Sequence, residues 1–237
     1  MVGMAAASAA PDHLESLARR HPLRPFLVAA VSMGFTAAGA SWSKELKDYA
    51  GEDAGFMVIA MGSGTSIESR AVSYTLNFRK KGSSEIGIIS FTPHRPALPF
   101  VGTKRDFDEP NETGFVDVRK LAPGDYEFYA ISAAMYGALQ WRWHPDDEFS
   151  IPFTISPGVA TYLGDFRGVS TSRRSAWSLG APLPTGAYFV VSNRADRDLP
   201  IARRKVPNLD QVNPAIPNGA VISSPYFEFS CLPSDCH

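Results

Sequence analysis

The amino-acid sequence predicts a mainly β protein, an antiparallel β-sandwich of about eight or nine strands with a short C-terminal helix. Apolar and polar residues alternate in many short segments between residues 55 and 192, which is typical of strands with one buried and one solvated face. Nineteen prolines and nineteen glycines mark turns between such segments. The segments recur at intervals of roughly 10–15 residues, which favours packed sheets over alternating βαβ units.

Composition and charge are ordinary for a globular protein. Apolar residues make up 44% and charged residues 20% of the 237 residues, which argues against overall disorder. The formal net charge is −1, so no long-range field attracts nucleic acid or an anionic membrane. We therefore expect no nucleic-acid partner.

The N-terminal region differs from the rest of the chain. Arg19, Arg20 and Arg24 precede the apolar run 26-FLVAAVSMGFTAAGA-40, which ends in small residues. This layout is typical of a secretory signal peptide, and the run is short for a membrane span, which needs roughly 20 apolar residues. Residues 1–40 are interpreted as a signal peptide, with an N-terminal tail or an uncleaved anchor as the alternatives. The first interpretation predicts export to the periplasm or cell envelope, without a stable membrane span.

The remainder divides into three expected parts: a linker over 41–54, a β-sandwich domain over 55–215 and a C-terminal extension over 216–237. The extension holds both cysteines of the chain, Cys231 and Cys236. A small disulfide is expected between them in an oxidising compartment. Free thiols on a loose tail are an alternative. A metal site with the neighbouring histidine is another, although it lacks a fourth ligand.

The strands are expected in order along the domain. Alternation is clearest at 72–78, where Val72, Tyr74, Leu76 and Phe78 share one face. Further strands are expected at 56–61, 86–91, 115–121, 125–132, 149–155, 160–166, 187–192 and 226–230. The segments 56–61 and 187–192 are apolar throughout, as in central strands covered on both faces.

Proline and glycine place the connections. Pro152 cannot donate to a β-ladder, so the strand at 149–155 is expected at an edge or with this residue turned outward. The sequences 122-APGD-125 and 156-SPGV-159 predict type II turns, because glycine tolerates the positive φ at the third position. One helix is expected over 196–209, capped by Asp198 and with Pro200 in its first turn.

Signatures of catalysis and of cofactor binding are absent from the sequence. The glycine-rich 61-MGSGTS-66 lacks the Lys-Ser/Thr ending of a phosphate-binding loop, and the histidines lack metal-ligand spacing. The acidic loop 106-DFDEPNE-112 offers oxygen ligands for calcium, but without the EF-hand pattern. Solvated acids at a hairpin tip are the default interpretation of that loop. No cofactor is expected.

The stretch 135-MYGALQWRWH-144 holds the candidate binding residues. On a strand, Trp141 and Trp143 share a face and Arg142 points the other way. Exposed paired aromatics stack on sugar rings or anchor a protein partner, whereas large aromatics also cover sandwich cores. If a binding site exists, we expect it at Tyr136, Trp141 and Trp143, with His144 at the rim.

Several motifs together resemble a known group of proteins. They are LAPGDYEFY, FSIPFTISPG, TYLGDF and VVSNRADRDLPIARRKVPNL, over roughly residues 50–215. This chain resembles uncharacterised bacterial envelope proteins, many of them lipoproteins, that are built on a small β-sandwich. The element LAPGDYEF alone also resembles transthyretin-like modules, which occur as carboxypeptidase regulatory domains. The resemblance implies a fold and an envelope location, and it carries no catalytic residue.

The sequence therefore predicts a non-enzymatic exported or cell-envelope protein that serves as an accessory or binding module, with an envelope protein or a glycan as its partner. The alternatives are an envelope-directed hydrolase whose site is built from loops and a calcium- or metal-binding protein.

Overall fold

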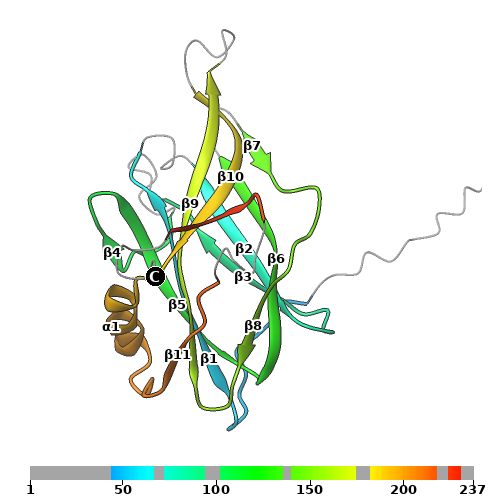
Figure 1. The fold of residues 1–237 in the computed structure, drawn as a ribbon, viewed down its shortest axis with the longest axis vertical. Helices are drawn as coiled ribbons and strands as arrows, with labels where there is room; N and C mark the ends of the chain where they lie inside the picture. Colours follow the sequence, from blue (N-terminus) through cyan, green and yellow to red (C-terminus); the bar gives the residue numbers. More distant parts are fainter. Residues whose placement is uncertain are drawn as a thin grey trace, which may run out of the picture. The chain divides into compact units, whose positions relative to one another are not determined.

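The computed structural model describes residues 44–66, 72–93, 102–135, 140–174, 182–217 and 224–230, all within one compact unit over 42–237. Within these residues the chain forms twelve strands and one helix (Figure 1). The expected signal peptide or tail over 1–40 lies outside the described residues, as do Cys231 and Cys236.

The strands form two sheets. The larger has the order β12 (Phe227–Ser230), β10 (Pro182–Ser192), β9 (Ala160–Arg174), β1 (Gly55–Gly64), β5 (Glu112–Leu121) and β4 (Phe107–Asp108), with β11 (Val212–Pro214) also paired to β9. The smaller has the order β3 (Ile86–Phe91), β2 (Ser73–Lys80), β6 (Gly124–Met135) and β7 (Trp141–Trp143), with β8 (Ile151–Ile155) also paired to β6. The mainly β architecture is confirmed.

Two details of the expected architecture are wrong. The larger sheet is mixed, because β1 pairs with β9, β10 with β12 and β11 with β9 in parallel. Alternation shows which residues face a core, but it says nothing about the direction of the neighbouring strand. The described strands also exceed the expected number, because β4, β7 and β11 have two or three residues each and are too short to show alternation.

Both sheets contribute to one buried group of side chains, called here the shared apolar cluster. Phe128 of β6 lies 5.5 Å from Phe166 of β9, and Tyr74 of β2 lies 6.1 Å from Phe189 of β10, between ring centroids. The cluster also holds Met57, Ile59 and Met61 on one side of β1 and the alternating residues of β2. The apolar faces of the two sheets are therefore buried together.

Helix α1 (Ala195–Lys205) covers the other side of the larger sheet (Figure 1). Its Ile201 and Ala202 pack with Val58, Ala60 and Tyr162 in a second apolar cluster. Strand β1 is thus buried on both faces, as its unbroken apolar sequence predicted. None of the helical residues that the structure describes makes a segment long and apolar enough to cross a bilayer.

The expected start of this helix is wrong. Arg194 occupies the N-cap position without a side-chain cap, and Asp198 is buried inside the helix, where it bonds to other side chains. Pro200 consequently lies in the helix interior instead of its first turn. Asp198 resembles a cap in sequence, but its tertiary partners decide its role.

The predicted positive φ of both glycines, the turn at 156–159 and the edge position of Pro152 are confirmed. Gly124 and Gly158 have φ values of 137° and 69°, and Val159 N–H donates to Ser156 O at 3.3 Å to close the second turn. Pro152 is exposed on β8, which lies at the edge of the smaller sheet.

Bulges interrupt the alternation in β9, β6 and β10, and those in β9 and β6 lie near polar sites. In β9, Tyr162 pairs with Val58 and Asp165 with Ala60, so β9 carries one extra residue there. Gly164, at φ 101°, supplies the left-handed backbone of this bulge. In β6 the extra residue is Tyr129, because Phe128 and Ala130 pair with the adjacent residues Phe78 and Asn77. A bulge changes the face to which the following side chains point. The bulge in β9 lies beneath α1, and the bulge in β6 lies at the edge of the smaller sheet.

Phe166 is fully buried in the shared apolar cluster and contacts three other aromatic rings. We expect Phe166→Ala to lower the free energy of unfolding by about 3–5 kcal/mol, through lost burial and a residual cavity. Urea denaturation followed by circular dichroism measures this. Ile88→Ala is the control, because Ile88 is 38% exposed, and its change should stay within about 0.5 kcal/mol. Equal effects of the two substitutions would contradict a core shared by the sheets.

Candidate functional site

A gap in the edge of the smaller sheet forms the first candidate site. Strand β7 pairs with Ala133–Met135 of β6, and β8 pairs with Gly124–Phe128. Between them, the seven residues 144–150 face only the four residues 129–132. One backbone hydrogen bond joins these two described stretches, from Phe149 N–H to Tyr129 O at 3.1 Å. The longer segment therefore bows away from the sheet, next to the Tyr129 bulge.

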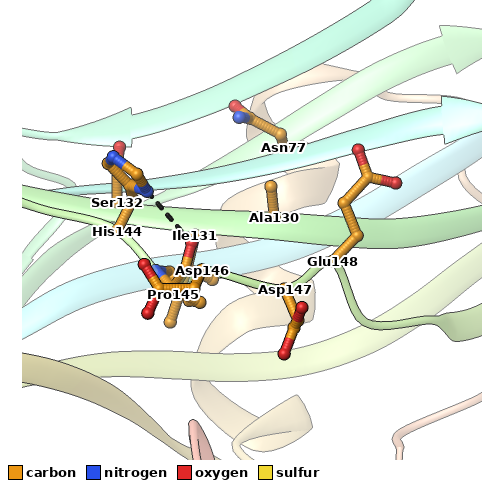
Figure 2. Close-up of a pocket in the computed structure, with 9 residues that line it drawn as sticks. All are labelled: Asn77, Ala130, Ile131, Ser132, His144, Pro145, Asp146, Asp147 and Glu148. Carbon is orange, nitrogen blue, oxygen red and sulfur yellow. Dashed lines mark hydrogen bonds between the residues drawn. The ribbon is translucent and has the colours of Figure 1, made fainter.

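A pocket of about 210 Å³, called here the β6 pocket, lies in this gap. Asn77 of β2 and Ala130–Ser132 of β6 line one side, and the segment His144–Glu148 lines the other. Figure 2 shows His144 and Ser132 at one end of the pocket and Glu148 at the other. Ligand pockets commonly have about 300–1,000 Å³, so this one has room for part of a ligand.

The pocket offers mainly hydrogen-bond acceptors. Asp146, Asp147 and Glu148 contribute carboxylates, and neither lysine nor arginine is among its lining residues. Oδ1 of Asn77 is buried and has no hydrogen-bond partner among the described residues. Ser132 adds a hydroxyl, which can donate or accept. The arrangement suits a ligand group that donates hydrogen bonds.

Arg79 fastens the pocket segment to the sheet. Its Nη2 lies 3.0 Å from Glu148 Oε2 and its Nε 2.8 Å from Glu127 Oε1, while its guanidinium covers the Tyr129 ring at 4.2 Å. Ser150 donates to Glu127 at 2.6 Å. This bond, followed by those from Arg79, lowers the pKa of Glu127 although burial opposes the shift. Glu127 therefore stays ionised, and Arg79 stays in place beside the pocket.

The structure places the predicted binding residues in different surroundings. Trp141 and Trp143 share a face of β7, as expected, but both are half-buried and pack against the shared apolar cluster. The ring of Trp143 also meets Tyr226 at 5.9 Å. Of the two interpretations, an exposed binding surface or a cover for the core, this arrangement corresponds to the cover for the core. His144 lines the β6 pocket, and Tyr136 lies outside the described residues.

Sequence reasoning missed the other side of this pocket. Asn77 and Ser132 occupy outward positions of ordinary strands, and nothing in their sequence surroundings separates them from other solvated residues. The acidic run at 146–148 is the one feature of the sequence that could have indicated this pocket. His144 Nδ1 lies 3.0 Å from Pro145 O, and no serine hydroxyl bonds to this imidazole among the residues described.

The second candidate is a group of charged residues beneath α1, called here the α1 charge cluster: Glu109, Glu112, Asp165, Arg194, Arg197 and Asp198. Gly114 leaves space for the Phe107 ring under this cluster, because a Cβ at residue 114 would lie 2.5 Å from that ring. The Phe107 ring packs over Gly114, and the Arg197 guanidinium covers that ring at 3.6 Å from its centroid. The glycine thus brings the helix close to the sheet.

Arg197 is surrounded by carboxyl groups. It lies 2.7 Å from Asp198, 3.1 Å from Asp165 and 3.4 Å from Glu112, and 3.8 Å from Glu109. Burial alone lowers the pKa of Arg197, but attraction to Asp165 and the other carboxylates outweighs burial and raises it above its ordinary value. The guanidinium is therefore a fixed positive charge at the centre of the cluster.

The acidic loop is largely committed to ion pairs. Asp106 pairs with Lys205 at 2.5 Å, Asp108 with Arg105 at 2.8 Å, and Glu109 with Arg194 at 2.8 Å. Glu112 is only 6% exposed, so the expectation of solvated acids at a hairpin tip is wrong for this residue. Across the described ranges, no group of three His, Cys, Asp or Glu side chains is arranged to hold a metal ion.

Comparisons with known proteins give no family. No protein-family model and no curated protein matches the chain. Among solved structures, a leucine-rich repeat protein from Bacteroides thetaiotaomicron is similar over 48% of this chain, with 11% identity and a TM-score of 0.28. The match spans 13% of that protein's length. So low a TM-score carries no argument about fold or function.

Removing the central cation of the α1 charge cluster should be costly. We expect Arg197→Met to lower the free energy of unfolding by about 3–5 kcal/mol, because it leaves buried carboxyl groups without their counter-charge. Arg203→Met is the matched control, since Arg203 lies exposed on the last turn of the same helix, and should change stability by less than about 0.5 kcal/mol. Thermal and urea unfolding measure both. A tolerated Arg197→Met would show that the cluster adds little to stability.

Proposed function

We propose that this protein is an exported, non-enzymatic β-sandwich of the cell envelope and that it serves as a binding module through the β6 pocket. The observation that carries the binding proposal is the gap in the sheet edge. There, seven residues of connecting chain face four residues of β6 and enclose an acceptor-lined pocket.

The sandwich arrangement is supported by the shared apolar cluster. Two sheets that bury their apolar faces in one cluster are expected to stack face to face, as layered β folds do. The resemblance of the motifs LAPGDYEFY and FSIPFTISPG to envelope β-sandwich proteins is consistent with this proposal. It also supports the assignment to the cell envelope.

Export is supported by the sequence of the N-terminal region. A basic segment, the apolar run 26–40 and a small-residue ending have the order that targeting machinery recognises. Mass spectrometry of the protein purified from its native compartment tests this. A mature N-terminus near residue 41 is expected, and a cytoplasmic protein that retains residues 1–40 would overturn the proposal of export.

The pocket suits the hydroxyl groups of a glycan. Sugar hydroxyls donate hydrogen bonds to carboxylate and amide oxygens, which the pocket supplies at Asn77, Asp146 and Asp147. Tyr129 adds an aromatic ring beside the pocket, already covered on one face by Arg79. The limited pocket volume indicates recognition of one sugar unit of a larger chain.

A glycan array probed with the purified protein, followed by calorimetry on the best ligand, tests this function. We expect Asp147→Asn to weaken binding by about 1.5–3 kcal/mol, because a hydrogen bond to a charged group is lost, and Asn77→Ala by about 0.5–1.5 kcal/mol, because the lost bond is neutral. The loss at Asp147 corresponds to about tenfold or more in Kd.

Asn213→Ala is the matched control, because Asn213 is exposed on β11 of the other sheet. It should leave binding unchanged. If the array finds no ligand, or if the two pocket variants bind as well as the parent protein, the pocket has no role in binding.

A further inference from the structure

A second feature, independent of the β6 pocket, is the excess of carboxyl groups over guanidinium groups in the α1 charge cluster. Four carboxyl groups face two guanidinium groups there, and Asp165 and Asp198 are both 0% exposed. Buried charges without counter-charges are strongly unfavourable. An excess of buried carboxyl groups therefore favours the uptake of a proton.

Hydrogen bonding indicates where that proton resides. Burial raises the pKa of Asp198 above its ordinary value. Asp198 accepts from Arg197 Nε at 2.7 Å and from the Tyr162 hydroxyl at 2.6 Å, and both bonds oppose that shift by favouring its ionised form. Neither oxygen of Asp165 has a hydrogen-bond partner among the described residues, and Oε1 of Glu112 has none either. Asp165, with two oxygens that lack such partners and with Glu112 as a neighbour, is thus the place for the proton.

The charged surroundings of Asp165 come from three directions. Glu112 faces it from β5, and Arg197 and Asp198 face it from α1, with Glu109 and Arg194 beyond them. On its own strand, Tyr162 and Arg167 share its side of the sheet by alternation around the bulge. Within the described residues, Arg197 alone forms an ion pair with Asp165.

We propose that helix α1 is held on the larger sheet by one proton on Asp165, and that loss of this proton at higher pH releases the helix. Release would uncover Val58, Ala60 and Tyr162, which α1 buries in the second apolar cluster. The device thus controls whether the outer face of the larger sheet is covered.

The direction of the pH dependence follows from linkage. Burial and then repulsion from Glu112 raise the pKa of Asp165 well above its ordinary 3.8. The docked state therefore binds more protons than the released state. Docking is complete below the ordinary pKa and weakens as the pH rises through the raised one. Release of one proton increases the opening equilibrium constant by up to about tenfold per pH unit in that window.

Amide hydrogen exchange of the full chain from about pH 4 to about pH 8 tests this proposal. After correction for the intrinsic exchange rate, protection of the amides of 198–205 should fall with pH, while protection of β2 and β6 stays constant. Asp165→Asn carries a permanently neutral side chain of the same shape and should give protection of α1 that is independent of pH. Asp108→Asn is the control. It changes an exposed acid on β4, which pairs with the strand of Glu112, and it should keep the pH dependence of the parent protein.

Carbon NMR titration of the Asp165 carboxyl is a second readout, which does not depend on a variant that folds. It should show the proton retained at pH values where exposed aspartates are ionised. In Glu112→Gln the repulsion is lost, so this titration should move to lower pH. The proposal is wrong if Asp165 titrates like an exposed aspartate, or if protection of α1 in the parent protein does not vary with pH.

Discussion

The shared apolar cluster determines where both polar sites lie, because each site occurs where a strand must change which side chains face that cluster. Leu163 and Phe166 both belong to the cluster, although three residues apart they would lie on opposite faces of a regular strand. The bulge at Gly164 resolves this conflict and places Asp165 beneath α1. In β6, Phe128 and Ile131 have the same spacing, and the bulge at Tyr129 turns polar surface toward the β6 pocket.

The two sites use similar residues under different dielectric conditions. Asp146, Asp147 and Glu148 are exposed, so their interactions are screened and weak unless a ligand excludes water. Glu112, Asp165 and Asp198 are buried, where an unbalanced charge is costly. Burial raises the pKa of Asp165 most clearly, so its protonated form is favoured there. In the functions we propose, the same carboxyl chemistry serves recognition at one site and the docking of a helix at the other.

Helix α1 is attached to the larger sheet through a chain of contacts between a glycine, an aromatic ring and a cation. Gly114 leaves room for Phe107, the Phe107 ring supports Arg197, and Arg197 draws together carboxyl groups from β5, β9 and the helix itself. Near the other end of the helix, Lys205 bonds to Asp106 and to Val116 O. The short helix is consequently fixed near both ends, although the side chain of its N-cap residue, Arg194, makes no capping bond.

The sequence by itself determined the mainly β class, most of the strands, the Pro-Gly turns and the burial of β1 on both faces, because these depend on local alternation and backbone preference. It also determined that Trp141 and Trp143 share a face. Only the tertiary structure decided the parallel pairings, the bulges in β6 and β9, the closing of the pocket by Asn77 and Ser132, and the burial of Asp165 against Glu112 and Arg197. Those features join residues that are distant in the chain, and a strand carries no local signal for the partner it meets or for the residue at which its register shifts.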